Sequence, residues 1–219
     1  MGSLDEYLKP TYFCDFDRIP EIGRTASRLT TQPVEGQETF CGIYRFVKEL
    51  PYGLEDWDVS ASDTLRKGWG MCLGKTNLLV AMLRSLQVAA RYRVYQIVSE
   101  GTLWRWVVGQ DAELAAQMGD PRHEQDHVVA EVYLNCWETY DPSRDAALER
   151  GMKRLGIPLE RKPISQPGGD PQPIVLASID EWAANRQQSR RFRENRQLLF
   201  SKINERFDKI RALGAGSSA

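Results

Sequence analysis

The sequence predicts a protein of the α+β class, with helices and antiparallel strands in separate stretches of the chain. A helix is expected to begin near Cys72, because apolar residues recur there at three- and four-residue spacing as far as Leu86. Residues 88–98 and 127–134 are rich in β-branched and aromatic side chains, which is typical of strands. Residues 137–140 follow after a short turn, so the last two strands are expected to form an antiparallel hairpin.

The composition is that of an ordinary globular protein, and it argues against several classes of function. The chain has 219 residues, of which 42% are hydrophobic and 27% charged, with a net charge of −1. It can therefore bury a sizeable core, and nucleic-acid binding is not expected. The four cysteines are widely spaced without a CxxC pair, so we expect neither a metal site nor a disulfide framework, and no cofactor.

The sequence also bears on where the protein resides. Its N-terminus has no basic stretch that leads into an apolar one, so no signal peptide is predicted. No apolar run approaches the ~20 residues that are needed to cross a bilayer. We therefore expect a cytoplasmic protein without a membrane partner.

The N-terminal third is expected to supply helices that flank the centre of the chain. Proline at a first helical turn, proline after a last turn and apolar residues at helical spacing mark these elements. We expect, in order, an extended surface segment at 1–16, helices at 19–29 and 33–50, and a short helix at 64–67 capped by Ser62 or Asp63. The inner face of the second helix is expected to consist of Phe40, Ile43, Tyr44 and Val47.

Cys72 lies where a glycine-rich turn meets the apolar helix. Gly68 and Gly70 supply the backbone freedom that a sharp entry into this helix needs. Unpaired N–H groups and the macrodipole at a helix N-terminus favour thiolate over thiol, and can lower a cysteine pKa from ~8.5 into the range ~3.5–7.5. A buried structural cysteine fits the same stretch, because free cysteines are often small core residues. The stretch by itself leaves both interpretations open.

The hairpin provides a second candidate group of functional residues. If residues 134–136 form its loop, Tyr133 pairs with Trp137, and His127 and Asp141 share one face with backbones ~7–8 Å apart. A two-residue loop would place them on opposite faces. A lone histidine is often structural, and an aspartate before proline is often a turn residue. A cysteine nucleophile, a histidine base and an orienting carboxylate together form a known catalytic arrangement, and their joint occurrence favours that function.

The remaining segments are expected to surround this core. Residues 99–126 interrupt the strand pattern and are expected to form an insertion near the site, where ligand-facing loops usually lie. A helix is expected at 145–155, a proline- and glycine-rich connector at 158–177, one long amphipathic helix at 178–213 and a disordered tail at 214–219. The apolar stripe of the long helix favours docking to the core, or to a second copy as a homodimer, over nucleic-acid binding.

These motifs together resemble the transglutaminase-like superfamily. Gly70-Met71-Cys72, followed by Lys75-Thr76-Asn77-Leu78-Leu79 and Leu83-Arg84, resembles its nucleophile helix. His127 with Glu131-Val132-Tyr133-Leu134, and then Tyr140-Asp141-Pro142, resembles its His and Asp segments. The resemblance covers roughly residues 8–143. The chain departs from the family at Val129, where Trp is frequent, and at 87–91, where the usual proline before Ala-Arg is absent.

The resemblance implies a papain-like core, in which the nucleophile helix packs on an antiparallel sheet, and a Cys72–His127–Asp141 triad within a catalytic domain at 1–157. It also implies thioester chemistry on an amide or thioester of a peptide or small molecule, by hydrolysis or by acyl transfer to an amine. For the oxyanion, the backbone N–H of Cys72 and the indole of Trp57 or Trp69 are candidates, although core packing also explains these tryptophans. The alternative function is a catalytically silent module that binds peptides or partners in the same groove.

Overall fold

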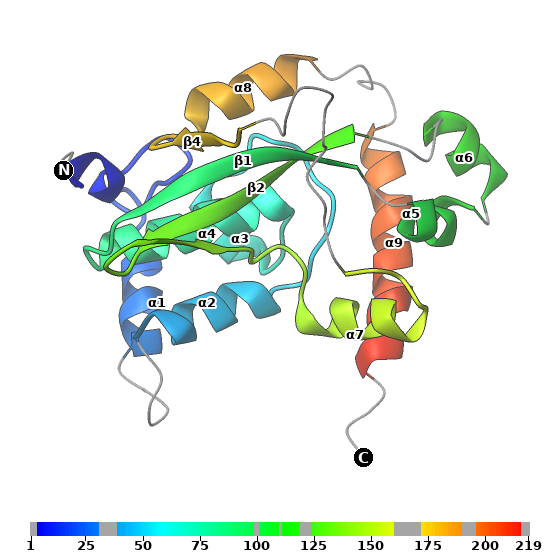
Figure 1. The fold of residues 1–219 in the computed structure, drawn as a ribbon, viewed down its shortest axis with the longest axis horizontal. Coiled ribbons are helices and arrows are strands. Elements are labelled where there is room, and N and C mark those ends of the chain that lie inside the picture. The colour runs from blue at the N-terminus through cyan, green and yellow to red at the C-terminus, as the bar shows by residue number, and fades with distance from the viewer. Residues whose placement is uncertain are drawn as a thin grey trace.

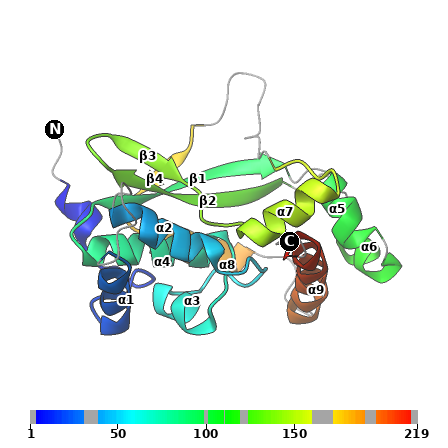
Figure 2. The same cartoon turned by 90° about the horizontal axis from the view of Figure 1, so that it is seen from below.

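Helices cover one face of a four-stranded antiparallel sheet in the computed structural model (Figures 1 and 2). The structure describes residues 4–30, 39–98, 101–109, 111–118, 124–159, 172–189 and 196–215. The strands are β1 (Ala90–Val98), β2 (Glu124–Tyr133), β3 (Trp137–Tyr140) and β4 (Ile174–Leu176), in the spatial order β3-β2-β1-β4. The prediction of an α+β protein with a helix packed on an antiparallel sheet is confirmed.

The helices fall into two groups around this sheet. The first group consists of the 3-10 helix η1 (Asp5–Leu8), α1 (Pro20–Thr30), α2 (Thr39–Glu49), α3 (Ala61–Lys67), α4 (Cys72–Ser85) and α8 (Asp180–Ser189). The second group consists of α5 (Gly101–Val108), α6 (Ala112–Met118), α7 (Ala146–Arg154) and α9 (Arg196–Ala215). Among the described helices, none is both long enough and apolar enough to pass through a lipid bilayer.

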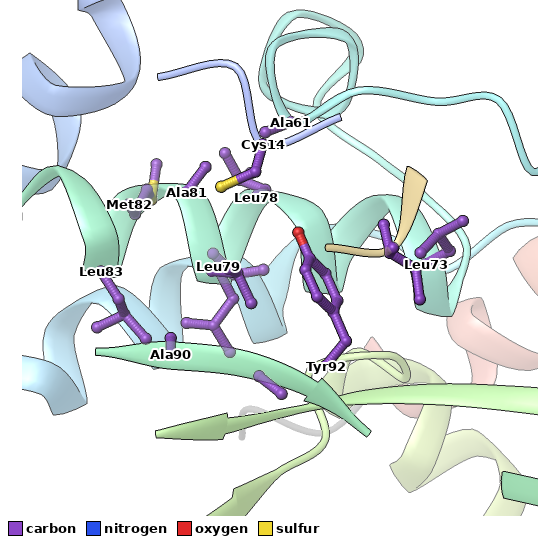
Figure 3. Close-up of a cluster of buried hydrophobic side chains, with 14 of the residues drawn as sticks. Cys14, Ala61, Leu73, Leu78, Leu79, Ala81, Met82, Leu83, Ala90 and Tyr92 are labelled. Atoms are coloured by element: carbon purple, nitrogen blue, oxygen red, sulfur yellow. The ribbon is translucent and has the colours of Figure 1, made fainter. Parts of the chain in front are cut away.

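The helix that begins at Cys72, α4, is the centre of the first group. The sequence predicted one buried face, but every residue from Cys72 to Arg84 is buried, so that expectation was wrong. The reason is that α4 is enclosed by α1, α2 and α3 and lies against β1 and β2. Figure 3 shows Leu73, Leu78 and Leu79 of this helix with Tyr92 of β1 beside them. Its polar residues are therefore buried together with its apolar ones.

Of the two hairpin registers that the sequence left open, the structure has the one that places His127 and Asp141 on the same face. Tyr133 pairs with Trp137, and residues 134–136 form a three-residue loop. Asn135 accommodates the turn with a φ of 79°, and the Leu134 N–H donates to the Cys136 carbonyl across 2.9 Å. The ladder next to the loop continues to the Ala130–Tyr140 pair.

Two details of the N-terminal third differ from expectation. The segment before α1 is not confined to the surface, since Phe13 and Cys14 are buried in the main core. The short helix α3 begins earlier than predicted and is capped by Ser60, which forms a reciprocal capping box with Asp63. Of the predicted inner face of α2, Phe40, Ile43 and Val47 are buried as expected, whereas Tyr44 is half-buried.

The single C-terminal helix predicted at 178–213 differs from the described residues, where α8 and α9 pack on different clusters and residues 190–195 between them lie outside the described part. Ile179 and Ala183, at α8, belong to the main core, whereas Ile203, Phe207 and Ile210 of α9 belong to a second cluster. That second cluster also contains Val107, Val108 and Leu114 of the predicted insertion and Leu148 and Met152 of α7. Figure 1 shows that α8 and α9 run in different directions, as helices that pack on two separate apolar clusters must.

Other boundaries also change. The predicted connector ends in β4, which pairs with β1, and the start of β2 lies inside the predicted insertion. The predicted tail begins inside α9, which ends at Ala215, and residues 216–219 lie outside the described part. The apolar stripe on which homodimerisation was predicted is largely buried within the same chain: Leu199, Ile203, Phe207 and Ile210 are buried, Leu213 is exposed, and Phe192 lies outside the described residues. Homodimerisation remains a prediction.

Polar contacts attach α9 to the segment that leads to α3. Arg211 donates to the Asp145 carboxylate and to the Tyr52 carbonyl, the latter over 2.8 Å. Asn204 exchanges two hydrogen bonds with the backbone of Leu54. Burial opposes ionisation of Asp145, yet the bonds from Arg211 and from two backbone N–H groups hold its pKa below the usual value. The docked helix thereby fixes residues 52–54, which lie beside the entry to α4.

Candidate active site

The structure places Cys72 at the first residue of α4, as the sequence predicted. The preceding residue, Met71, is the N-cap, and the helix bonds begin with the Lys75 N–H donating to the Met71 carbonyl. Gly68 has the left-handed φ of 70° that ends α3 and permits the sharp turn. The Cys72 side chain therefore lies at the positive end of the helix, where an anion is stabilised. The residue is only 4% exposed, so the sulfur lies in a closed site.

His127 lies on β2, opposite Tyr95 of β1. Its Nε2 is 2.9 Å from Oδ2 of Asp141, which is the contact that the hairpin register predicts. The ring also meets Tyr95 edge to face, with 5.3 Å between ring centroids. His127 is 3% exposed, whereas the side chain of Asp141 is 37% exposed. The pair is therefore open to solvent on the carboxylate side.

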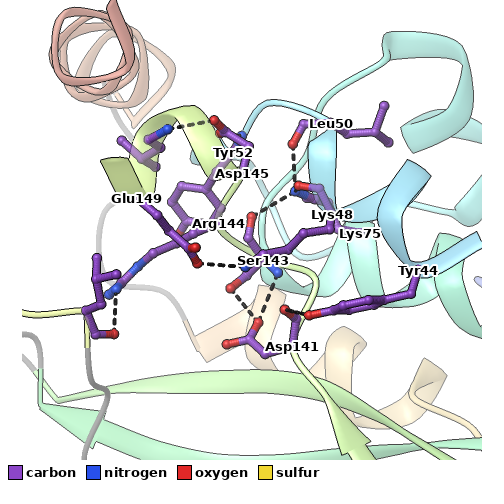
Figure 4. Close-up of polar contacts among 12 residues, drawn as sticks. Tyr44, Lys48, Leu50, Tyr52, Lys75, Asp141, Ser143, Arg144, Asp145 and Glu149 are labelled. Atoms are coloured by element: carbon purple, nitrogen blue, oxygen red, sulfur yellow. Dashed lines mark hydrogen bonds and ion pairs between the residues drawn. The ribbon is translucent and has the colours of Figure 1, made fainter. Parts of the chain in front are cut away.

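Asp141 is held at each of its oxygen atoms. Oδ2 faces His127, while Oδ1 accepts from the Ser143 N–H at 2.9 Å and from the Ser143 hydroxyl at 2.5 Å. The Tyr44 hydroxyl of α2 donates to the Asp141 carbonyl over 3.0 Å, as Figure 4 shows. Burial, together with the charges of Asp141 and Glu149, raises the pKa of Tyr44 to about 12, so this hydroxyl stays protonated and can donate.

Two residues of α4, one turn after Cys72, reach the elements that carry His127 and Asp141. The Thr76 hydroxyl donates to the carbonyl of Val128, the residue after His127, across 3.2 Å. The Lys75 ammonium donates to the carbonyl of Ser143, two residues after Asp141, across 2.9 Å. The first turn of α4 is thus joined to the chain beside both members of the pair. These two bonds join the helix that begins at Cys72 to the parts of the chain that carry His127 and Asp141.

A buried carboxylate that the sequence interpretation missed lies at the entry to α4. Oε1 of Glu55 accepts from the Met71 N–H at 2.8 Å, and Oε2 pairs with the Lys67 ammonium. Burial raises the pKa of Glu55, although Lys67 and the Met71 N–H oppose this effect. A side chain on Gly74 would meet Oε1 at 2.7 Å, so the carboxylate packs directly on the first turn. No spacing rule predicts this contact, because it joins an irregular segment to a helix N-terminus.

The two candidate oxyanion tryptophans lie in different surroundings. Trp57 is buried and meets Trp182 of α8 edge to face, with 5.2 Å between centroids. Trp69 lies beside Gly53, and its ring receives the Lys67 ammonium 4.6 Å from the centroid. Both contacts fit the packing interpretation, and an oxyanion role for either indole remains a prediction. Within the described ranges, no cluster of three or more His, Cys, Asp or Glu could hold a metal ion.

Comparison with known proteins bears on the family of the chain. The model of the transglutaminase-like superfamily matches residues 24–142, which is just over half of the chain and includes Cys72, His127 and Asp141. No curated protein has a significant match. A solved structure from Cytophaga hutchinsonii, described as a candidate cysteine protease, matches with 18% identity and a TM-score of 0.45 over 68% of this chain and 45% of that one. The chain thus spans less than half of that protein's length. With its nucleophile-type helix packed on an antiparallel sheet, the chain has the papain-like fold of cysteine enzymes and belongs to the transglutaminase-like superfamily.

Proposed function

We propose that this protein is a cysteine enzyme that cleaves an amide or thioester through Cys72, His127 and Asp141, by hydrolysis or by transfer of the acyl group to an amine. The observation that carries the proposal is the 2.9 Å contact between His127 Nε2 and Asp141 Oδ2, beside a helix that begins at Cys72. A carboxylate on one ring nitrogen fixes the tautomer and makes the other nitrogen, Nδ1, the base.

In the first half of the proposed reaction, His127 Nδ1 takes the thiol proton of Cys72. The thiolate attacks the carbonyl carbon of the substrate and forms a new C–S bond. The oxyanion that develops would accept from the backbone N–H of Cys72 and from an indole N–H, with Trp57 and Trp69 as candidates. The bond to the leaving group breaks as His127 returns its proton to the departing amine or thiol, and a thioester remains on Cys72.

In the second half, His127 removes a proton from water, which attacks the thioester carbonyl. The C–S bond breaks, the thiolate recovers its proton from His127, and a carboxylic acid leaves the site. An amine in place of water forms a new amide by the same steps. Throughout, Asp141 stays ionised and stabilises the imidazolium. The held position of Asp141, with three donors on its oxygens besides His127, supports this role.

The low exposure of the site also fits a second function, that of a catalytically silent binding module. Cys72 and His127 are 4% and 3% exposed, so a substrate carbonyl reaches the sulfur only if the site opens. A catalytically silent binding module would need no such opening. The two functions differ in the state of the thiol, since only the enzyme requires a thiolate paired with an imidazolium.

Site-resolved alkylation with iodoacetamide at different pH values separates the two functions. For an ordinary thiol of pKa ~8.5, the alkylation rate falls about 500-fold between pH 8.5 and pH 5.5. An ion-paired thiolate loses much less, and the ratio of rates at the two pH values cancels the slower access of the reagent to a buried sulfur. Exposed Cys136 in the same chain is the internal reference.

We expect the rate ratio of Cys72 to stay within about 10-fold across this pH range, and His127→Ala to make it resemble that of Cys136. Mass spectrometry of the cysteine peptides measures both. If Cys72 in the unmodified protein follows Cys136, the proposed enzyme is wrong and the binding module is favoured.

A further inference from the structure

Lys75 and Thr76 are consecutive polar residues in the otherwise largely apolar helix α4, and both are fully buried. They lie three and four residues after Cys72, so all three side chains emerge from one side of the helix within about one turn, or 5.4 Å. Lys75 reaches the loop that follows Asp141, and Thr76 reaches the strand that carries His127. Nothing in the proposed chemistry uses either side chain directly.

The Lys75 ammonium is fully matched by backbone acceptors. Its Nζ donates to the carbonyls of Lys48 at 3.0 Å, Leu50 at 2.6 Å and Ser143 at 2.9 Å (Figure 4). The first two acceptors lie at the end of α2, which also supplies Tyr44 to the Asp141 carbonyl. An ammonium has three donors and a neutral amine has two, so only the protonated form satisfies all three carbonyls.

Nearby carboxylates offset part of the cost of burying the Lys75 ammonium. Burial lowers the pKa of Lys75 to about 7, with nearby Lys48 acting in the same direction, while the carboxylates of Asp145, Asp141 and Glu49 oppose the shift. A cation buried without such partners would be strongly disfavoured. The three carbonyls and the three carboxylates are the partners that a buried ammonium at this position needs.

A closed path of bonds runs from the nucleophile helix through the catalytic pair and back. The Ser143 carbonyl accepts from Lys75, while the Ser143 N–H and hydroxyl donate to Asp141. Asp141 then contacts His127, whose neighbour Val128 accepts from Thr76 of the same helix. Cys72, His127 and Asp141 come from three separate elements, and these two side chains fix the helix to the other two.

We propose that Lys75 is a positioning residue, assisted by Thr76, that sets the distance and orientation of the His127–Asp141 pair relative to Cys72. This inference rests on the proposed function. It differs from a general structural role of Lys75, because it predicts a change in the acid–base behaviour of Cys72 in protein that is still folded. Loss of stability alone would leave that behaviour unchanged.

The test is the alkylation profile of Cys72 in Lys75→Met, with Lys48→Met as the matched control. Lys48→Met removes an ammonium from the same neighbourhood, where it pairs with Glu149 at 2.7 Å, but leaves the carbonyls and the catalytic pair untouched. Thr76→Val is a second variant of nearly equal shape, which removes only the hydroxyl donor. Thermal unfolding of each variant shows whether it is folded at the assay temperature.

We expect Lys75→Met to lower the alkylation rate of Cys72 at pH 5.5 by about 100-fold and Thr76→Val by about 10-fold, because small displacements within a catalytic group cost this much. The pH profile of Cys72 in Lys75→Met should approach that of Cys136, and Lys48→Met should keep the unmodified profile. If Lys75→Met does not fold, Thr76→Val carries the test, and an unchanged rate there overturns the inference.

The two proposals fail in different ways. If Cys72 of the unmodified protein already behaves as an ordinary thiol, the proposed function is wrong and the positioning role falls with it. If the unmodified protein reacts rapidly at pH 5.5 and folded Lys75→Met does so equally, the positioning role alone is wrong.

Discussion

Gly→Ala substitutions are expected to change stability in opposite directions at two helical glycines, Gly151 where α7 meets α9 and Gly23 of α1. At Gly151 of α7, an added Cβ would lie 1.9 Å from the Ile210 carbonyl oxygen and 2.7 Å from its carbon. At Gly23 of α1, an added Cβ would meet the nearest atom, in the Ser85 side chain, at 3.7 Å. Gly→Ala therefore introduces a clash with backbone in the first case and an ordinary contact in the second.

The magnitudes follow from these distances. Real Cβ atoms essentially never approach closer than 3.0 Å, so Gly151→Ala must move α7 and α9 apart by about 1 Å. Overpacking of this kind costs about 1–3 kcal/mol, and the better helix propensity of alanine offsets about 0.5–1 kcal/mol. We expect Gly151→Ala to lower the free energy of unfolding by about 1–2 kcal/mol and Gly23→Ala to raise it by about 0.5–1 kcal/mol.

Urea unfolding followed by circular dichroism measures both changes under the same conditions. The slope of the transition should stay constant, so that the midpoints report stability alone. A Gly151→Ala variant as stable as the unmodified protein, or more so, would show that the two helices do not approach as closely as described. Failure of Gly23→Ala to stabilise would instead contradict the assumed gain in propensity.

Three further predictions concern charge and the thiols. Because the pKa of Asp145 is lowered in the folded protein, the ionised carboxylate stabilises the fold above the unfolded pKa of ~3.9, and this stabilisation is lost as pH falls through the folded pKa. Asp145→Asn should therefore shrink the difference in urea midpoint between pH 7 and pH 3. An unchanged difference would refute this prediction. Burial raises the pKa of the Cys14 thiol to about 12, so iodoacetamide should label Cys14 at pH 8 only after urea unfolding, and labelling of the folded protein would contradict its burial. Adduct formation or turnover should be abolished in Cys72→Ala, nearly abolished in His127→Ala and reduced less in Asp141→Asn, with melting temperature as the control; wild-type activity in Cys72→Ala would mean that the nucleophile is misassigned.

The sequence determined the helix start correctly, because the start depends on local spacing, and it restricted the hairpin to two registers. Cys72 follows a glycine-rich turn and precedes an apolar run, which defines a helix N-terminus without reference to the rest of the chain. In the hairpin, the two-residue period of strands made the shared face depend on the loop length, and the structure has the three-residue loop that brings His127 and Asp141 into contact. Residue type and short-range geometry were sufficient for the helix start, whereas the loop length of the hairpin was decided by the structure.

Only the tertiary structure decided what surrounds these residues. The spacing of apolar residues in α4 predicted one buried face, but helices on three sides and a sheet on another bury Lys75 and Thr76 as well. The acceptors of Lys75 lie about 25 and 68 residues away in the sequence, and Glu55 reaches Met71 from an irregular segment. No periodic pattern of residues in the sequence indicates contacts over such separations.

The C-terminal region shows the same limit. Its apolar residues indicated that something must cover them, and the choice between the core and a second copy stayed open at the level of sequence. The structure buries Phe207 and Ile210 against α7, while Arg211 reaches Asp145 and Tyr52. A hydrophobic stripe specifies how much apolar area must be buried. Which surface buries it depends on the fit of shape and charge between segments that only the folded chain brings together.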